Sequence, residues 1–249
     1  MKFEAIKLEC SKVGYPNSNR TKDFWYVKCS IEPNSSVLDK SIQMMIKKDS
    51  EMLAELVSPK AANDSTLDRT QERILANSIA GLLAEYAWKT FLNFCTNKLL
   101  VQETAFEESK NQIDLITLKS KMKIEVRSSF PYNGINFAIC HNPKQFDILG
   151  PYHNDYKPNE PEKELYLRTL YHVKDYGDFL NKFLFDKTEI YLTGGATWDM
   201  MFDKNCSLVK DLVPEDENTN VKSNYRVVPF QHALDTMEIL KLIKKEENE

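Results

Sequence analysis

The stretch Gln112-Ile113-Asp114-Leu115-Ile116-Thr117-Leu118 is followed, after a short polar turn, by Met122-Lys123-Ile124-Glu125-Val126-Arg127-Ser128-Ser129, a pattern typical of a β-hairpin. Each run carries one carboxylate, Asp114 or Glu125, among apolar residues. Burying a carboxylate costs free energy unless a cation lies beside it. Two such carboxylates on adjacent strands therefore suggest a divalent metal ion.

The length of the turn decides whether the two carboxylates share a face. Residues directly opposite each other in an antiparallel pair point to the same side of the sheet. A two-residue turn at Lys119-Ser120 places Asp114 opposite Glu125. A four-residue turn places Asp114 opposite Arg127 and diagonal to Glu125, whereas a three-residue turn places it opposite Val126, facing away. Two of these three registers bring Asp114, Glu125 and Arg127 together.

Hydrophobic periodicity predicts further strands and helices around this hairpin. The predicted strands cover 3–10, 24–31, 99–104, 166–173 and 189–192, and the predicted helices about 37–56, 67–94, 176–185 and 237–249, the last ending in solvated charge. Gly194-Gly195 is interpreted as a strand-to-helix turn, and the proline-rich segment 141–165 as a long loop or insertion. With no internal repeat in the sequence, we expect a single α/β domain over 1–249, with a mixed sheet flanked by helices.

Composition is typical of a globular protein, with 42% hydrophobic and 28% charged residues among 249. No apolar run approaches the roughly 20 residues that cross a bilayer, so we expect a cytoplasmic chain without a membrane partner. The net charge of −4 is not typical of a nucleic-acid-binding protein. The 33 lysines and arginines can nevertheless cluster on one face.

Several residues invite a functional interpretation but favour a structural one. The five cysteines, Cys10, Cys29, Cys95, Cys140 and Cys206, have wide spacings, so we expect reduced structural thiols. The methionines at 44, 45 and 52 are expected to pack in the core, and the four histidines lack metal-type spacing. In the proline-rich segment, Tyr152, Tyr156 and Lys157 are candidates for a DNA groove, with a plain surface loop as the alternative.

An aspartate followed across a hairpin by Glu-x-Lys resembles the signature of the PD-(D/E)xK nuclease superfamily, which has the restriction-endonuclease-like fold. That family also carries a helical glutamate upstream, and Gly81-Leu82-Leu83-Ala84-Glu85-Tyr86 is similar to that motif. The resemblance covers about 79–129. The chain departs from the pattern at Arg127, where the family has lysine, and at Ile113, where it has proline. Arginine does not deprotonate in proteins and so is no general base, and Lys123 on the same face is a candidate substitute.

The resemblance implies a Mg²⁺- or Mn²⁺-dependent endonuclease that hydrolyses the phosphodiester bonds of double-stranded DNA, most like a type II restriction endonuclease or a related defence nuclease. It implies Asp114 and Glu125 as metal ligands, Glu85 as an accessory ligand, and Arg127 as a charge beside the phosphate. Cutting both strands would call for two sites and hence a homodimer. The alternative is a catalytically inactive module of the same fold that binds DNA or another protein. The candidate DNA contacts are Lys123, Ser128, Ser129, Tyr132 and Asn133.

Overall fold

The computed structural model describes residues 1–10, 23–56, 70–104, 113–140, 146–153, 162–212 and 223–247. A seven-stranded sheet with the order β1-β2-β8-β7-β5-β4-β3 forms its centre, and a three-stranded sheet has the order β6-β10-β9. The strands of the large sheet are β1 Phe3–Leu8, β2 Phe24–Ile31, β3 Val101–Glu103, β4 Leu115–Thr117, β5 Lys123–Ser129, β7 Leu165–Leu170 and β8 Thr188–Thr197. Those of the small sheet are β6 Ile148–His153, β9 Leu208–Leu212 and β10 Ser223–Val228. β5 and β7 pair in parallel, and the other paired neighbours are antiparallel. This mixed sheet with flanking helices confirms the expected fold class and is consistent with a restriction-endonuclease-like arrangement.

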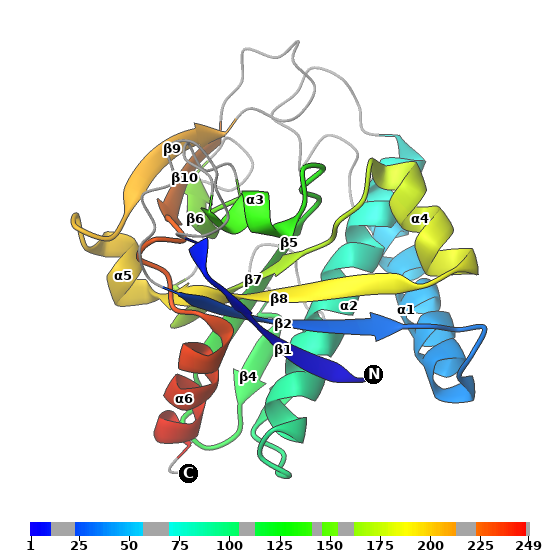
Figure 1. Cartoon of the computed structure of the whole chain (residues 1–249), viewed down its shortest axis with the longest axis horizontal. Helices are drawn as coiled ribbons and strands as arrows, with labels where there is room; N and C mark the ends of the chain where they lie inside the picture. The colour runs from blue at the N-terminus through cyan, green and yellow to red at the C-terminus, as the bar shows by residue number, and fades with distance from the viewer. Residues whose placement is uncertain are drawn as a thin grey trace.

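Helices α1 Val37–Leu56, α2 Gln71–Phe94, α4 Tyr176–Phe185 and α6 Thr236–Glu246 contribute buried side chains to one apolar core on one face of the large sheet. The other face is covered by α3 Ile135–Cys140, α5 Trp198–Phe202 and the small sheet, which share a second core. In Figure 1, α3, β6, β9 and β10 lie grouped together, away from α1 and α6. Successive side chains of a strand point to opposite faces of the sheet. In β7, Leu165 and Leu167 accordingly lie in the first core, while Tyr166 and Leu170 lie in the second.

Helix α2 is fixed in rotation by two buried hydrogen bonds to β7 and the residue after it. The Trp88 indole donates to the Thr169 hydroxyl at 3.0 Å, and the Tyr171 hydroxyl donates to the Ala80 carbonyl at 2.8 Å. Thr70 caps the helix by accepting from the Arg73 backbone amide at 3.2 Å. These contacts decide which α2 side chains face the sheet and which face the groove described below.

The hairpin has the register that a two-residue turn would give, although its loop is longer. Leu115 pairs with Ile124 and Ile116 with Lys123. In the same register, Asp114 and Glu125 are the next residues opposite each other. The strands end at Thr117 and begin again at Lys123, and Lys121 in the loop adopts a positive φ of 59°. The loop thus adds residues without shifting the pairing, and the register prediction is confirmed.

Three sequence predictions about secondary structure are wrong. Ile148–His153 form β6 within the segment expected to be a loop, while 141–145 and 154–161, with Tyr156 and Lys157, lie outside the described residues. Gly194 and Gly195 lie inside β8, where Gly194 has φ +80° and Gly195 forms an isolated bridge with Leu234. The C-terminal helix ends at Glu246 rather than at 249, with buried Glu247 as its cap, and the expected solvated charge is present at exposed Lys245 and Glu246.

Two predictions about side chains are also wrong. Cys10 and Cys140 form a disulfide between the end of β1 and the end of α3, because the second core brings these distant segments together. Cys29, Cys95 and Cys206 are free thiols. Met44, Met45 and Met52 are 62%, 42% and 54% exposed, since α1 turns Ile42, Ile46 and Ala54 toward the core instead.

Among the described residues, no helix is long and apolar enough to cross a membrane.

Candidate functional site

Asp114 lies where the hairpin strands separate. Its carboxylate oxygen Oδ2 accepts a hydrogen bond of 2.7 Å from the backbone amide of Val126 in β5, beyond the residues of β5 that pair with β4. An unpaired strand amide needs a partner when it is buried, and the carboxylate supplies one. The aspartate is therefore held at the end of β4 with only 9% of its surface exposed.

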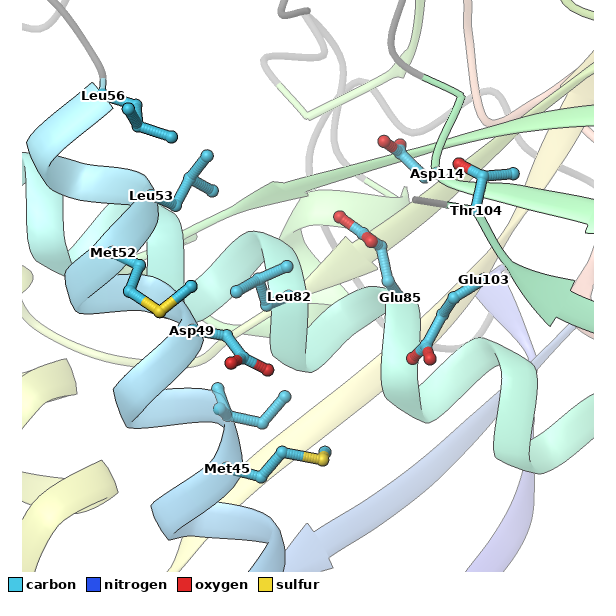
Figure 2. Close-up of a pocket in the computed structure, with 11 residues that line it drawn as sticks. Met45, Asp49, Met52, Leu53, Leu56, Leu82, Glu85, Glu103, Thr104 and Asp114 are labelled. Carbon is cyan, nitrogen blue, oxygen red and sulfur yellow. The ribbon is translucent and has the colours of Figure 1, made fainter. Parts of the chain in front are cut away.

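Glu85 approaches Asp114 from α2. Figure 2 shows the two carboxylates near each other and directed to the same side of a groove, with Thr104 next to Asp114. The groove has a volume of about 420 Å³, and its other wall is apolar: Met45, Ile46, Met52, Leu53 and Leu56 of α1 and Leu82 of α2. Among the described residues, those that line the groove carry four carboxylates, of Asp49, Glu85, Glu103 and Asp114, and no lysine or arginine.

Burial and neighbouring negative charge change the proton affinity of both carboxylates. Burial and then the nearby Glu125 raise the pKa of Asp114 to about 8, against the opposing effects of the Val126 amide, Lys163 and Arg127. Burial also raises the pKa of Glu85 well above its usual range, with Asp114 and Glu125 adding to the effect. Both groups are therefore costly to ionise in the metal-free protein.

Glu125, in contrast, is well supplied with cations. Its Oε1 lies 3.2 Å from Nη2 of Arg127, and its Oε2 accepts a hydrogen bond from Nζ of Lys163. Lys163 precedes β7 and is only 2% exposed. Sequence reasoning missed this lysine because it lies 38 residues from Glu125 in the chain, and only the parallel pairing of β5 with β7 brings it there.

A second buried cation, Arg168 of β7, pairs in register with Arg127 of β5. Its Nη2 donates to the Ser129 hydroxyl at 2.8 Å, and its Nε donates to the Phe146 carbonyl at 3.4 Å. Burial, followed by the repulsion of Arg127, lowers the pKa of Arg168 to about 9. The hydroxyl of Ser129, predicted to contact DNA, is therefore used inside the protein.

The remaining predicted contacts fall outside this cluster. Lys123 is exposed at the start of β5, where its backbone amide donates to the Glu164 carboxylate at 2.6 Å, and it is not among the residues that contact Glu125. Tyr132 and Asn133 are exposed between β5 and α3, and Ser128 is half-buried. The structure thus brings together Glu85, Asp114, Glu125 and Arg127, and leaves Lys123, Tyr132 and Asn133 on the surface.

Comparison with known proteins adds one relative. The chain is 28% identical over 242 residues to the uncharacterized protein MJECS01 of Methanocaldococcus jannaschii, with 81% of each chain covered. No protein-family model matches the chain, and no solved structure matches it. Because the relative is itself described as uncharacterized, the likeness assigns no activity.

The donor atoms of the site suit a hard divalent cation. Carboxylate oxygens are the ligands that Mg²⁺ and Mn²⁺ prefer, and Mg²⁺ commonly takes only one or two from a protein. Glu85 and Asp114 lie close enough to raise the pKa of the Glu85 carboxyl, and a cation between them would offset that repulsion, so these two residues fit such an ion. Within the described ranges, no three acidic, histidine or cysteine side chains form a ready group of ligands. Glu125 is directed to Lys163 and Arg127.

Proposed function

We propose that the chain is a metal-dependent endonuclease that hydrolyses phosphodiester bonds in double-stranded DNA, of the type II restriction or related defence class. The observation that carries the proposal is the pair of neighbouring carboxylates, Asp114 and Glu85, at the point where the hairpin strands separate beside Glu125. Mg²⁺ or Mn²⁺ held there would lower the pKa of a bound water and neutralise charge on the phosphate.

The chain's own residues have separate tasks in this proposal. Asp114 and Glu85 hold the cation, and the Val126 amide keeps the Asp114 carboxylate in position. Arg127 remains protonated at any physiological pH, so it offers a permanent positive charge to the phosphate. The apolar wall of the groove excludes water from one side of the carboxylates, which strengthens electrostatic interactions there.

The test is cleavage of plasmid DNA with Mg²⁺ and with Mn²⁺ by wild type and by the Asp114→Asn variant. Asn keeps an oxygen that accepts from Val126 but loses the charge, so we expect cleavage to fall by about 10²-fold or more. The exposed Asp199→Asn of α5 is the matched control and should cleave like wild type. Equal cleavage by wild type and Asp114→Asn would refute the proposal.

The inactive module is a second candidate, favoured by the ion pairs that occupy both oxygens of Glu125. It predicts no cleavage with any divalent ion, together with DNA affinity that falls as salt rises. A homodimer is proposed for the active enzyme because two strands call for two sites. Sedimentation of the chain with and without a DNA duplex measures that state directly.

A further inference from the structure

Lys163 is held at the start of β7 by a rigid arrangement. The next residue, Glu164, accepts the backbone amide of Lys123 at 2.6 Å through its side chain and the backbone amide of Trp198 at 3.0 Å through its carbonyl. These two bonds tie the start of β7 to the start of β5 and to the start of α5. The Lys163 side chain is thereby confined next to Glu125, almost fully out of solvent.

A buried ammonium group needs an anion, and Glu125 is the partner that the structure shows. The same carboxylate also pairs with Arg127. Glu125 thus has two cations, whereas burial, followed by the repulsion of neighbouring carboxylates, raises the pKa values of Glu85 and Asp114. A divalent cation drawn to Glu85 and Asp114 would find the third carboxylate of the cluster already neutralised.

Lysine is suited to give up such a position. Its charge is compact and sits on a flexible four-carbon stem, whereas the guanidinium of arginine is a planar fork that holds a carboxylate in a fixed geometry. Of the two cations on Glu125, Lys163 is therefore the one that moves at smaller cost, and Oε2 is the oxygen that it frees.

We propose that Lys163 is an exchangeable counter-ion: it neutralises Glu125 in the metal-free protein, leaves Glu125 when a divalent cation binds, and then contacts the substrate's phosphate. This inference rests on the proposed function for the identity of the substrate. It makes Lys163, rather than Lys123, the mobile cation of the site. It also predicts that Lys163 has opposite effects on metal binding and on cleavage, which a purely structural role does not produce.

The experiment measures Mn²⁺ affinity by titration calorimetry, and cleavage of a DNA duplex at saturating Mn²⁺, for wild type, Lys163→Met and Lys163→Arg. Lys163→Met should bind Mn²⁺ about fivefold or more tightly than wild type, because the competing charge is gone. It should cleave about tenfold or more slowly, because the phosphate loses a cation. Lys163→Arg keeps the charge in a group that leaves a carboxylate less readily, so it should bind Mn²⁺ no more tightly than wild type.

The matched control is Lys241→Met, an exposed lysine on α6, which removes the same charge far from Glu125 and should change neither quantity. In a Glu125→Gln background, adding Lys163→Met should leave the Mn²⁺ affinity unchanged, because Lys163 and Mn²⁺ then no longer compete for a carboxylate at position 125. Thermal unfolding without metal checks that each variant is folded, and Lys163→Gln, which also removes the charge, carries the test if Lys163→Met is not.

The outcomes separate the two proposals. If Lys163→Met binds Mn²⁺ no more tightly than wild type, or cleaves as fast, the counter-ion inference is overturned while the nuclease proposal stands. If wild type binds Mn²⁺ and Lys163→Met binds it more tightly, but wild type cleaves no DNA, the exchange at Glu125 is supported and the nuclease proposal fails. If wild type binds no Mn²⁺, both are overturned.

Discussion

At the scale of single residues, Asp114 combines two demands that conflict. Its carboxylate caps a strand amide, which favours the charged form, and it lies among other carboxylates in a buried position, which favours the neutral form. The second effect is larger, since the pKa is raised to about 8. A buried carboxylate that is costly to ionise is a candidate functional group, in keeping with the cation that we propose for this site.

This conflict makes stability depend on pH in metal-free buffer. Between the ordinary aspartate pKa of 3.8 and a folded-state pKa of about 8, folded Asp114 binds a proton that the unfolded chain has lost. The free energy of unfolding should therefore fall as pH rises through that window. Asp114→Asn cannot ionise, so its advantage over wild type should grow from pH 4 to pH 8 in urea denaturation, whereas parallel curves would contradict the prediction.

At the scale of elements, the loop between β4 and β5 is held by the far end of the chain. Glu247, 1% exposed after α6, accepts the Lys119 amide at 2.9 Å, the Ser120 amide at 2.9 Å and the Ser120 hydroxyl at 2.8 Å. The Lys119 ammonium donates to the Glu247 carbonyl at 3.0 Å. The loop of the hairpin that carries Asp114 and Glu125 is thus held in place by the residue that caps α6.

Glu247→Gln should lower the free energy of unfolding by about 1–3 kcal/mol, because an amide replaces one accepting oxygen by a donor that faces other donors. It should also slow any metal-dependent cleavage, since the loop no longer fixes the hairpin. Glu246→Gln, the exposed neighbour, is the control and should stay within about 0.5 kcal/mol of wild type. Similar losses for the two variants in chemical denaturation would argue against this function of Glu247.

Strand β8 depends on a glycine at its bulge. At Gly194 the backbone has φ +80°, and an added Cβ would lie 2.1 Å from the Leu234 carbonyl oxygen. Gly194→Ala should therefore destabilise the protein by about 2 kcal/mol or more. Gly81→Ala is the opposite case: this glycine lies inside α2 with nothing within 4 Å of an added Cβ, so alanine should stabilise by about 0.5–1 kcal/mol. Thermal unfolding of the two variants would test the contrast, and a stable Gly194→Ala would contradict it.

Sequence patterns predicted helices and strands best where a single buried apolar face stabilises the element. The helix at 176–185 has the predicted bounds, and the hairpin has one of the two registers, among the three left open, that bring Asp114 and Glu125 to the same face. The pattern could not show that α1 turns Met45 and Met52 toward a groove, because a stripe of methionines is equally consistent with a core. Neither could it find Lys163, since a cation that pairs across 38 residues leaves no local signal.

At the scale of the whole molecule, the large sheet is joined covalently to the layer that covers its second face. Cys10 follows β1 and Cys140 ends α3, with 130 residues between them. A disulfide closing so long a loop restricts the unfolded chain strongly, by about 2–4 kcal/mol for typical cases. The small sheet and α3 were not predicted from sequence, and this pairing of cysteines depends on them.

Reduction should therefore lower the melting temperature of the wild type, and Cys10→Ser should lower it by a similar amount. Adding dithiothreitol to Cys10→Ser should then have no further effect. Cys206→Ser, at a free thiol, is the control and should keep the full response to reductant. A wild type that melts at the same temperature with and without reductant would contradict a stabilising disulfide.

The parallel pairing of β5 with β7 also sets the order in which the site can form during folding. The hairpin of β4 and β5 closes over a few residues and can form early, whereas β7 must return past all of α3 and β6 before Lys163 meets Glu125. Contacts of this range form slowly compared with local ones. We therefore expect refolding chains to gain the acidic hairpin before its lysine, so that metal binding in pulse-refolding experiments appears before the native resistance to proteolysis. The nascent site would be, for that interval, a stronger metal binder than the finished one.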